Sequence, residues 1–166
     1  MHEHRRDQKI EASFALIVTS DSRTPETDET GRLAMRLLEE AGHNVKAYTI
    51  VENDGEKILA TLRGFLGNGA VQAVITSGGT GIGAKDRTVY AASGLFEREL
   101  PGFGELFRRL SQEEIGPAAA LSRATAGIAG GKPVFCLPGS RGAMRLALES
   151  IILPVIGHMI WELKRK

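Results

Sequence analysis

The chain has 166 residues, a length typical of one domain, and its 42% apolar and 25% charged residues are ordinary for a folded protein rather than a disordered one. Lysine and arginine (21) exceed aspartate and glutamate (20) by one, so we expect neither nucleic acid nor an acidic membrane as a partner. One cysteine excludes an intrachain disulfide. We expect a cytoplasmic protein, because residues 1–11 lack the apolar core of a signal peptide and the apolar stretch 151–161 is too short to span a bilayer.

After a flexible polar tail, expected over residues 1–12, short apolar runs alternate with apolar residues at helical spacing. The runs at 14–18, 45–51, 71–76 and 134–137 predict strands covered on both faces. Helical stripes lie between them, at Leu33, Leu37, Leu38 and Ala41, at Ile58, Leu62, Phe65 and Leu66, and at Phe103, Leu106, Phe107 and Leu110. A long C-terminal helix is expected over 144–159, kinked or interrupted at Pro154. The alternation predicts one doubly wound α/β domain over residues 13–166, with a mostly parallel sheet.

Ligands of open parallel sheets bind beyond the carboxyl ends of the strands. Four segments occupy such positions, at residues 20–29, 52–56, 77–88 and 138–142. All four are rich in glycine, hydroxyl or acidic residues, and none has the composition of a packing surface. We therefore expect the functional site to be built from these four strand exits.

The third predicted strand runs into a glycine-rich loop, which consists of Ser77, Gly78, Gly79, Thr80 and Gly81 and continues to Gly83. Glycine lets backbone N–H groups converge on an anion, and the two hydroxyls add donors, so we favour phosphate binding over a plain tight turn. A P-loop is excluded because no lysine directly follows Gly83. The dinucleotide fingerprint matches loosely over 79–84, which leaves a nicotinamide-binding module as a weak alternative.

Carboxylates follow two of the strand exits. Asp86, between Lys85 and Arg87, is predicted to hold Mg²⁺ near bound phosphates, although aspartate also caps helices well. Asn53 and Asp54 would complete an oxygen-ligand site with Asp86 if the sheet order brings the first three strands together. The alternative is that Asn53 and Asp54 form a turn in which Asp54 caps the next helix.

The remaining two exits carry candidate anion contacts. The late strand leaves through Leu137, Pro138, Gly139 and Ser140, and Ser140 would lie at a helix N-terminus, as an anion site or as a cap alone. The first strand leaves through Ser20, Asp21, Ser22 and Arg23, where the arginine is either an anion clamp or an ordinary surface residue.

Two other residue types carry no predicted chemistry. Cys136 lies in an apolar run and is predicted to be a buried strand residue rather than a nucleophile. The four histidines are scattered, and their spacing predicts neither a zinc site nor a catalytic triad.

Read in order, the motifs resemble the MoaB/Mog family of molybdenum cofactor biosynthesis proteins. They are SGGTG at 77–81 followed by Asp86, PGFGELFR at 101–108 and LPGS at 137–140, and segments 110–116 and 122–132 are similar to the MoaB branch. The resemblance covers nearly the whole chain from residue 14 onward. It implies a three-layer α/β/α molybdopterin-binding fold, a homotrimer or homohexamer, and other cofactor-biosynthesis proteins as possible partners. It also implies an adenylylation in which the terminal phosphate of molybdopterin attacks the α-phosphorus of Mg-ATP and pyrophosphate leaves.

The resemblance also assigns roles to residues. Residues 77–81 would hold the nucleotide phosphates and Asp86 the Mg²⁺, with Asn53 and Asp54 as the other catalytic positions. Pro101, Gly102 and residues 137–140 would shape the nucleotide pocket. Asp21 and Ser22, with Ser20 beside them, fall in the family's first-strand loop on the pterin side.

Two positions depart from the family pattern. Asn53 stands where active members resemble an aspartate, and Val89 and Tyr90 replace a Pro-Glu pair. An amide cannot supply a carboxylate's charge. The sequence therefore leaves two main functions, a molybdopterin adenylyltransferase and a molybdopterin-binding homologue without catalysis.

Overall fold

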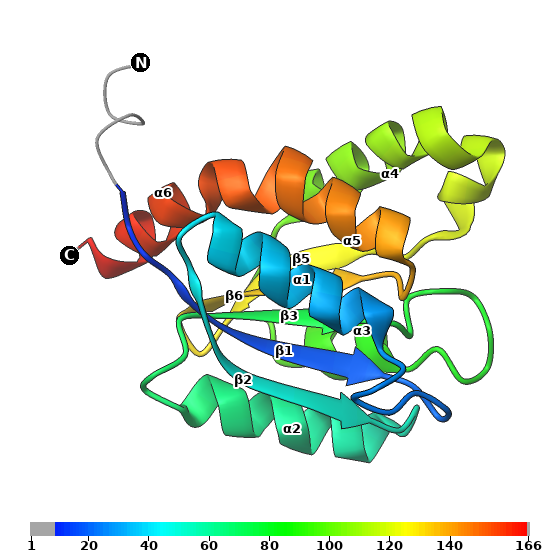
Figure 1. The fold of residues 1–166 in the computed structure, drawn as a ribbon, viewed down its shortest axis with the longest axis horizontal. Helices are drawn as coiled ribbons and strands as arrows, with labels where there is room; N and C mark the ends of the chain where they lie inside the picture. The colour runs from blue at the N-terminus through cyan, green and yellow to red at the C-terminus, as the bar shows by residue number, and fades with distance from the viewer. Residues whose placement is uncertain (1–8, 166) are drawn as a thin grey trace.

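A six-stranded sheet forms the middle layer of the computed structural model, which describes residues 9–165 (Figure 1). Its strands are β1 (Ser13–Thr19), β2 (Asn44–Val51), β3 (Ala73–Ser77), β4 (Arg98–Glu99), β5 (Thr125–Ala129) and β6 (Lys132–Leu137). The spatial order is β2-β1-β3-β6-β5-β4; the first four strands are parallel, and β5 and β4 complete the sheet through antiparallel pairs. The predicted α/β fold with a mostly parallel sheet is confirmed.

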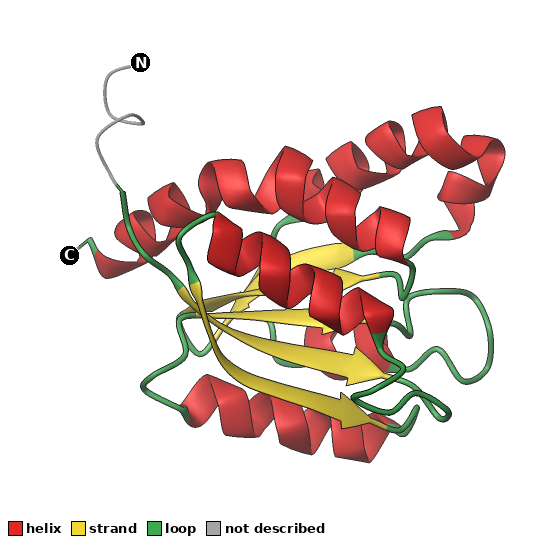
Figure 2. Cartoon of the chain, in the orientation of Figure 1, coloured by secondary structure: helices red, strands yellow, loops and turns green. Residues whose placement is uncertain are grey.

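Helices cover both faces of the sheet (Figure 2). One face carries α1 (Glu29–Glu40), α4 (Pro101–Ile115), α5 (Arg141–Ala147) and α6 (Leu153–Lys164), and the other carries α2 (Gly55–Gly67) and α3 (Thr88–Ser93). Alternate residues of β1 enter the two cores: Phe14 and Leu16 pack on the α1 side, and Ile17 packs on the α2 side. The continuous apolar runs thus reflect strands buried on both faces.

The hairpin of β5 and β6 was not predicted. Ala129 pairs with Lys132, so Gly130 and Gly131 alone form the turn, and both have positive φ (55° and 71°). A two-residue turn of this kind needs glycine because its twist matches that of the flanking strands. The hairpin makes this half of the sheet antiparallel.

The C-terminal helix departs from α-helical geometry in the turn before Pro154 but does not end there. A π-helical turn at Leu148–Ile152 joins α5 to α6, and Pro154 sits in the first turn of α6 without breaking the helix. The result is a continuous helix of 24 residues, long and apolar enough to cross a membrane by length and composition alone. Met144 and Leu148, however, are fully buried in the core beside the sheet, which is the packing of a core helix.

The packed domain begins earlier than residue 13. Ile10 packs against the core, and Ala12 is fully buried. The Ala12 N–H donates to His43 Nδ1 at 3.0 Å, and the Asn44 N–H donates to the Ala12 carbonyl at 2.9 Å. The first eight residues of the expected tail, with two of the four histidines, lie outside the described residues.

Candidate active site at the strand exits

The four parallel strands end at one edge of the sheet, where their exit segments lie side by side (Figure 1). Because β2, β1 and β3 are neighbours, the sheet order meets the condition for bringing the first three exits together. The exit of β6 lies next to that of β3.

The glycine-rich loop after β3 needs its glycines for two separate reasons. Gly78 and Gly79 have φ of +103° and +72°, and a Cβ at these positions would lie 2.6 Å from Thr19 Oγ1 and 2.1 Å from Thr88 Oγ1. The later pair, Gly81 and Gly83, instead makes room for an acid, since a Cβ on either would come within 2.9 Å of Asp86 Oδ2. The loop is therefore both a tight turn and a cradle for one carboxylate.

Asp86 folds back onto this loop. Its Oδ2 accepts a hydrogen bond from the Gly83 N–H at 2.8 Å, and its backbone N–H donates to the Gly83 carbonyl at 3.0 Å. The side chain is partly exposed. Asp86 thus lies at the rim of the loop with its charge accessible to a ligand.

Arg123, for which the sequence analysis predicts no role, holds the same loop from outside. Its backbone N–H donates to the Thr80 carbonyl at 2.8 Å, its Nε to the Gly81 carbonyl at 2.7 Å, and its Nη2 to the Asp86 carbonyl at 3.0 Å. Its guanidinium lies 4.9 Å from the centre of the Tyr90 ring. The only available signal was the family-like segment 122–132, in which no residue type indicates this contact.

A cavity of about 350 Å³ opens beside the loop. It brings together seven predicted site residues, which are Gly79, Thr80, Gly81, Asp86, Pro138, Gly139 and Ser140. The opposite wall was not predicted and comes from the end of α4, the 3₁₀ segment Gly116–Leu121 and the start of α5. Its members include Phe107, Ile115, Leu121 and Leu146, with Ser111 and Glu114 as polar groups. One wall is therefore polar and glycine-rich, and the other is largely apolar.

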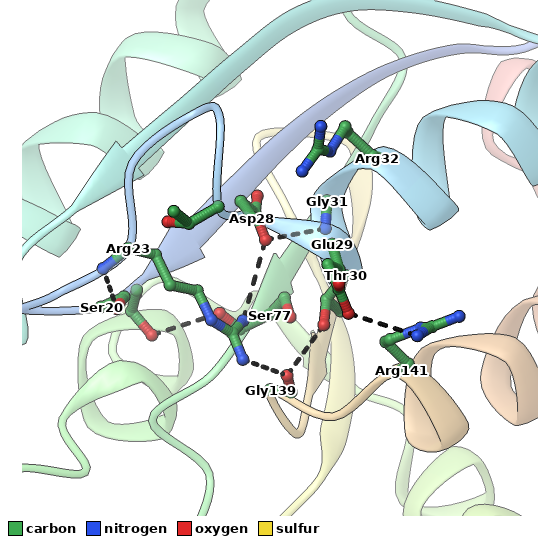
Figure 3. Close-up of polar contacts among 12 residues, drawn as sticks. Ser20, Arg23, Asp28, Glu29, Thr30, Gly31, Arg32, Ser77, Gly139 and Arg141 are labelled. Carbon is green, nitrogen blue, oxygen red and sulfur yellow. Dashed lines mark hydrogen bonds and ion pairs between the residues drawn. The ribbon is translucent and has the colours of Figure 1, made fainter.

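The exits of β1 and β6 are locked together through one carbonyl (Figure 3). Gly139 O accepts hydrogen bonds from Arg23 Nη2 and from Thr30 Oγ1, both at 3.1 Å. On its other side, Gly139 packs against Gly78, whose Cα would be 3.5 Å from an added Cβ. Arg23 is thus a clamp for the loop at 137–140, and its guanidinium also faces the buried Asp28, 3.8 Å from Oδ1.

Asp28 anchors this clamp. Its carboxylate is fully buried and accepts from the Gly31 N–H at 2.9 Å and from the Tyr48 hydroxyl at 2.5 Å. Burial is the larger cause that raises the pKa of Tyr48 above its ordinary value, and the hydrogen bond to Asp28 is the second. The hydroxyl therefore remains a donor. Asp28 is also the N-cap of α1, which ties the clamp to the first helix.

A polar group gathers at the exits of β1 and β2. Asp21 Oδ1 accepts from the Asn53 N–H at 2.8 Å, and Asp21 Oδ2 lies 3.5 Å from Lys85 Nζ. The hydrogen bonds from Asn53, and to a smaller extent Lys85, lower the pKa of Asp21. Ser20 Oγ organises the same loop by accepting from the backbone N–H groups of Ser22 and Arg23, at 3.2 and 3.0 Å. Ser22 itself is exposed.

Three other predicted site residues have local structural positions. Asp54 Oδ1 accepts from the N–H groups of Glu56 and Lys57 and caps α2, and no cluster of three or more acidic, histidine or cysteine side chains suited to a metal occurs within residues 9–165. The predicted ligand pair of Asp54 and Asp86 stays a prediction, in which other ligands would come from substrate or water. Pro101 and Gly102 begin α4 and are exposed, whereas the cavity lies at the other end of that helix, so they do not line it.

Two buried polar groups complete the description. Ser77 Oγ, at the end of β3, is the one buried side-chain polar atom in the described part of the chain without a hydrogen-bond partner. An unpaired buried hydroxyl is costly, which makes it a feature to explain. Cys136 is fully buried in β6, and burial raises the pKa of its thiol to about 11, as expected for a packing residue rather than a nucleophile.

Comparison with known proteins gives consistent matches over nearly the full length. Residues 15–158 match the family model described as "Probable molybdopterin binding domain". Molybdenum cofactor biosynthesis protein B of Bacillus cereus is 46% identical over 165 residues, which cover 99% of this chain and 98% of the relative.

Solved structures give the same result. A crystal structure of a molybdenum cofactor biosynthesis protein B superposes with a TM-score of 0.92 at 47% identity, covering 95% of this chain and 98% of the other. The tungsten cofactor synthesizing protein MoaB from Pyrococcus furiosus superposes with a TM-score of 0.84 at 35% identity, covering 93% and 98%.

Proposed function

The chain belongs to the molybdopterin-binding domain family that includes molybdenum cofactor biosynthesis protein B, and from that premise we propose that it acts in molybdenum cofactor biosynthesis as a molybdopterin adenylyltransferase. The reaction joins the terminal phosphate of molybdopterin to the α-phosphorus of ATP. A bond from a molybdopterin phosphate oxygen to the α-phosphorus forms, the bond between the α-phosphorus and its bridging oxygen breaks, and pyrophosphate leaves.

The observation that carries this proposal is the cavity at the strand exits. Seven residues of the glycine-rich loop, Asp86 and the loop at 138–140 line it, although they come from three distant parts of the sequence. Its apolar wall suits a flat ring, and its glycine-rich wall suits phosphates. The unpaired hydroxyl of Ser77 at the base of the same loop supports the presence of a polar ligand or water in the working protein.

Phosphoryl-type transfer needs positioning and charge neutralisation more than a protein nucleophile. In the proposed reaction the loop at 78–81 orients the nucleotide phosphates, and the clamp on Gly139 fixes the neighbouring loop on the same wall of the cavity. Asp21, Asn53 and Lys85 form the neighbouring polar group on the pterin side. Each group acts by holding a substrate in place.

The donor set fits a magnesium ion that enters with ATP rather than a resident ion. Mg²⁺ usually keeps several waters and takes one or two carboxylates plus substrate phosphates. Asp86 supplies one carboxylate at the cavity wall. When bound there, the ion would neutralise phosphate charge.

A second candidate, molybdopterin binding without catalysis, is favoured by Asn53. The Asn53 side chain lies beside Asp21, at the position where the family resemblance gives an acid, so this part of the site has one carboxylate fewer. On either function we propose a cytoplasmic homotrimer or homohexamer that works with other proteins of the pathway. The exposed apolar side chains of Leu106 and Val155, which lie outside the proposed nucleotide cavity, support assembly with further copies.

The deciding experiment measures pyrophosphate release from ATP by the purified protein with Mg²⁺, with and without molybdopterin. The adenylyltransferase is expected to release pyrophosphate only when molybdopterin is present. If titration shows molybdopterin binding but no pyrophosphate appears, the non-catalytic function replaces it.

A further inference from the structure

A second cavity, of about 430 Å³, lies on the other side of Asp86 from the first. Its wall includes Arg87, Tyr90 and Arg123, together with the segment 82–84. Asp86 is the one residue that lines both cavities. Two separate binding volumes therefore meet at Asp86, the carboxylate that the proposed function assigns to the magnesium ion of Mg-ATP.

The second cavity has cationic walls. Arg123 uses Nε and Nη2 to hold the loop, which leaves further N–H donors of its planar guanidinium for other groups. Its neighbour Tyr90 offers a ring face rather than a carboxylate, so the charge of Arg123 is stacked but not neutralised. Among the described residues, no acidic side chain forms an ion pair with Arg123 or with the exposed Arg87.

Asp86, the acid in the wall of this cavity, is held by the loop and forms no ion pair with either arginine. Asp86 Oδ2 accepts from the Gly83 N–H and lies against Gly81, so its carboxylate is directed into the glycine-rich loop. Two guanidinium groups thus share a cavity with one carboxylate, which is already hydrogen-bonded to the loop, so positive charge is in excess there. A guanidinium group can donate two parallel N–H···O hydrogen bonds to a phosphate, and these bonds are stronger than those from neutral donors.

We propose that this second cavity binds the pyrophosphate portion of ATP, and therefore the pyrophosphate product, through Arg87 and Arg123. The proposal rests on the proposed function for the direction of the nucleotide. With the base against the apolar wall of the first cavity and the α-phosphate at Asp86, the β- and γ-phosphates continue past Asp86 into the second. The positive charges of the two arginines would stabilise the pyrophosphate leaving group as its bond to the α-phosphorus breaks.

The test uses the full chain and isothermal titration with inorganic pyrophosphate, which requires neither molybdopterin nor turnover. Arg87→Gln removes one guanidinium. Tyr90→Glu places a carboxylate next to Arg123 and leaves the hydrogen bonds by which Arg123 holds the glycine-rich loop. Both variants are expected to weaken pyrophosphate binding at least tenfold. Arg63→Gln on α2 lowers the net charge by the same one unit as either variant, away from both cavities, and is the matched control.

Titration with AMP separates this subsite from the rest of the nucleotide site, because AMP lacks the β- and γ-phosphates. Equal AMP affinity in the wild type and Arg87→Gln, beside the tenfold loss for pyrophosphate, supports the proposal. No pyrophosphate binding by the wild type, no effect of Arg87→Gln, or an equal loss for AMP each overturns it. These outcomes are readable even if molybdopterin-dependent pyrophosphate release is never observed, so the two proposals fail separately.

Discussion

At the scale of single residues, the Asp86 side chain both holds the glycine-rich loop and lies where two cavities meet. Its Oδ2 accepts from the Gly83 N–H, and its carboxylate is the wall shared by two cavities. Asp86→Asn keeps an oxygen for that N–H but removes the charge. We expect adenylyl transfer to fall by about 100-fold or more, with a change of less than about 0.5 kcal/mol in the free energy of unfolding.

The measurement pairs the rate of pyrophosphate release with urea unfolding of the same preparation. Gly83→Ala is a useful companion, because its Cβ would meet Asp86 Oδ2 at 2.9 Å and push the carboxylate while leaving its charge. If Asp86→Asn loses stability in proportion to activity, Asp86 is a structural residue of the loop.

The residues of this site differ in how far the sequence could predict them. The glycines and Asp86 could be found because a run of glycines beside an acid after a buried strand has few structural uses. Arg123 could not, because its contacts to Gly81 and Asp86 span 42 and 37 residues, and an arginine without local partners has the pattern of a solvated side chain. For Asp54 the sequence leaves two roles open, since an aspartate before a helix has the same pattern as a cap and as a metal ligand; the structure shows the cap.

At the scale of elements, the N-terminus of α2 depends on Asp54. Its Oδ1 accepts from two backbone N–H groups that the helix leaves unpaired. Asp54→Ala is expected to lower the free energy of unfolding by about 1 kcal/mol, whereas Asp54→Ser retains a capping oxygen and most of the stability. Pyrophosphate release by Asp54→Ser distinguishes a cap from a catalytic acid, since a pure cap predicts a rate near that of the wild type.

His43 links the segment before β1 to the start of β2. Its Nδ1 accepts from the Ala12 N–H, and burial lowers the pKa of His43, opposed in part by Glu11. Because the unfolded imidazole titrates near about 6.5, the unfolded chain takes up a proton below that pH and the folded chain does not. The free energy of unfolding therefore decreases as the pH is lowered below about 6.5, by at most about 1.4 kcal/mol per pH unit for one proton.

Urea unfolding at pH 7.5 and 5.5 checks this linkage. We expect His43→Asn to show a smaller loss of stability on acidification than the wild type. His158→Asn is the control, because His158 and His43 line one surface cavity but only His43 bonds to the segment at 9–12. Equal losses in the wild type and His43→Asn would assign the pH dependence to other groups.

The strands that could be predicted from the sequence are those buried on both faces of the sheet. The strands β1, β3 and β6 are covered on both faces and carry strong apolar runs. The sequence of β5 is rich in small residues, and Gly127 is required because a Cβ there would lie 2.4 Å from the Phe96 ring. A strand that accommodates a neighbouring aromatic ring in this way has no hydrophobic pattern to detect.

At the scale of the whole molecule, the parallel order of β2, β1, β3 and β6 fixes which exits are neighbours, and that much follows from the fold class. The contacts between the exits do not follow from it. They depend on single side chains that reach across, such as the two donors that the first exit places on Gly139 O. The site is therefore a junction of loops whose positions are coupled.

This coupling can be measured at Gly139. Arg23→Gln and Thr30→Val each remove one donor to its carbonyl and leave the other, so the loop at 137–140 keeps its position in part. Each single variant is expected to weaken AMP binding about two- to threefold and the double variant about 20-fold or more, beyond the product of the two losses. A shared acceptor predicts this excess, because only the double variant leaves the carbonyl without a donor from the first exit.

Titration with AMP across the four proteins gives the coupling directly. Thr61→Val is the matched control, since its hydroxyl donates only to Lys57 O within α2. Losses that multiply independently would show that Arg23 and Thr30 act on separate parts of the molecule. An excess loss in the double variant, with unchanged m-values in urea, would place the coupling in the native junction rather than in the unfolded chain.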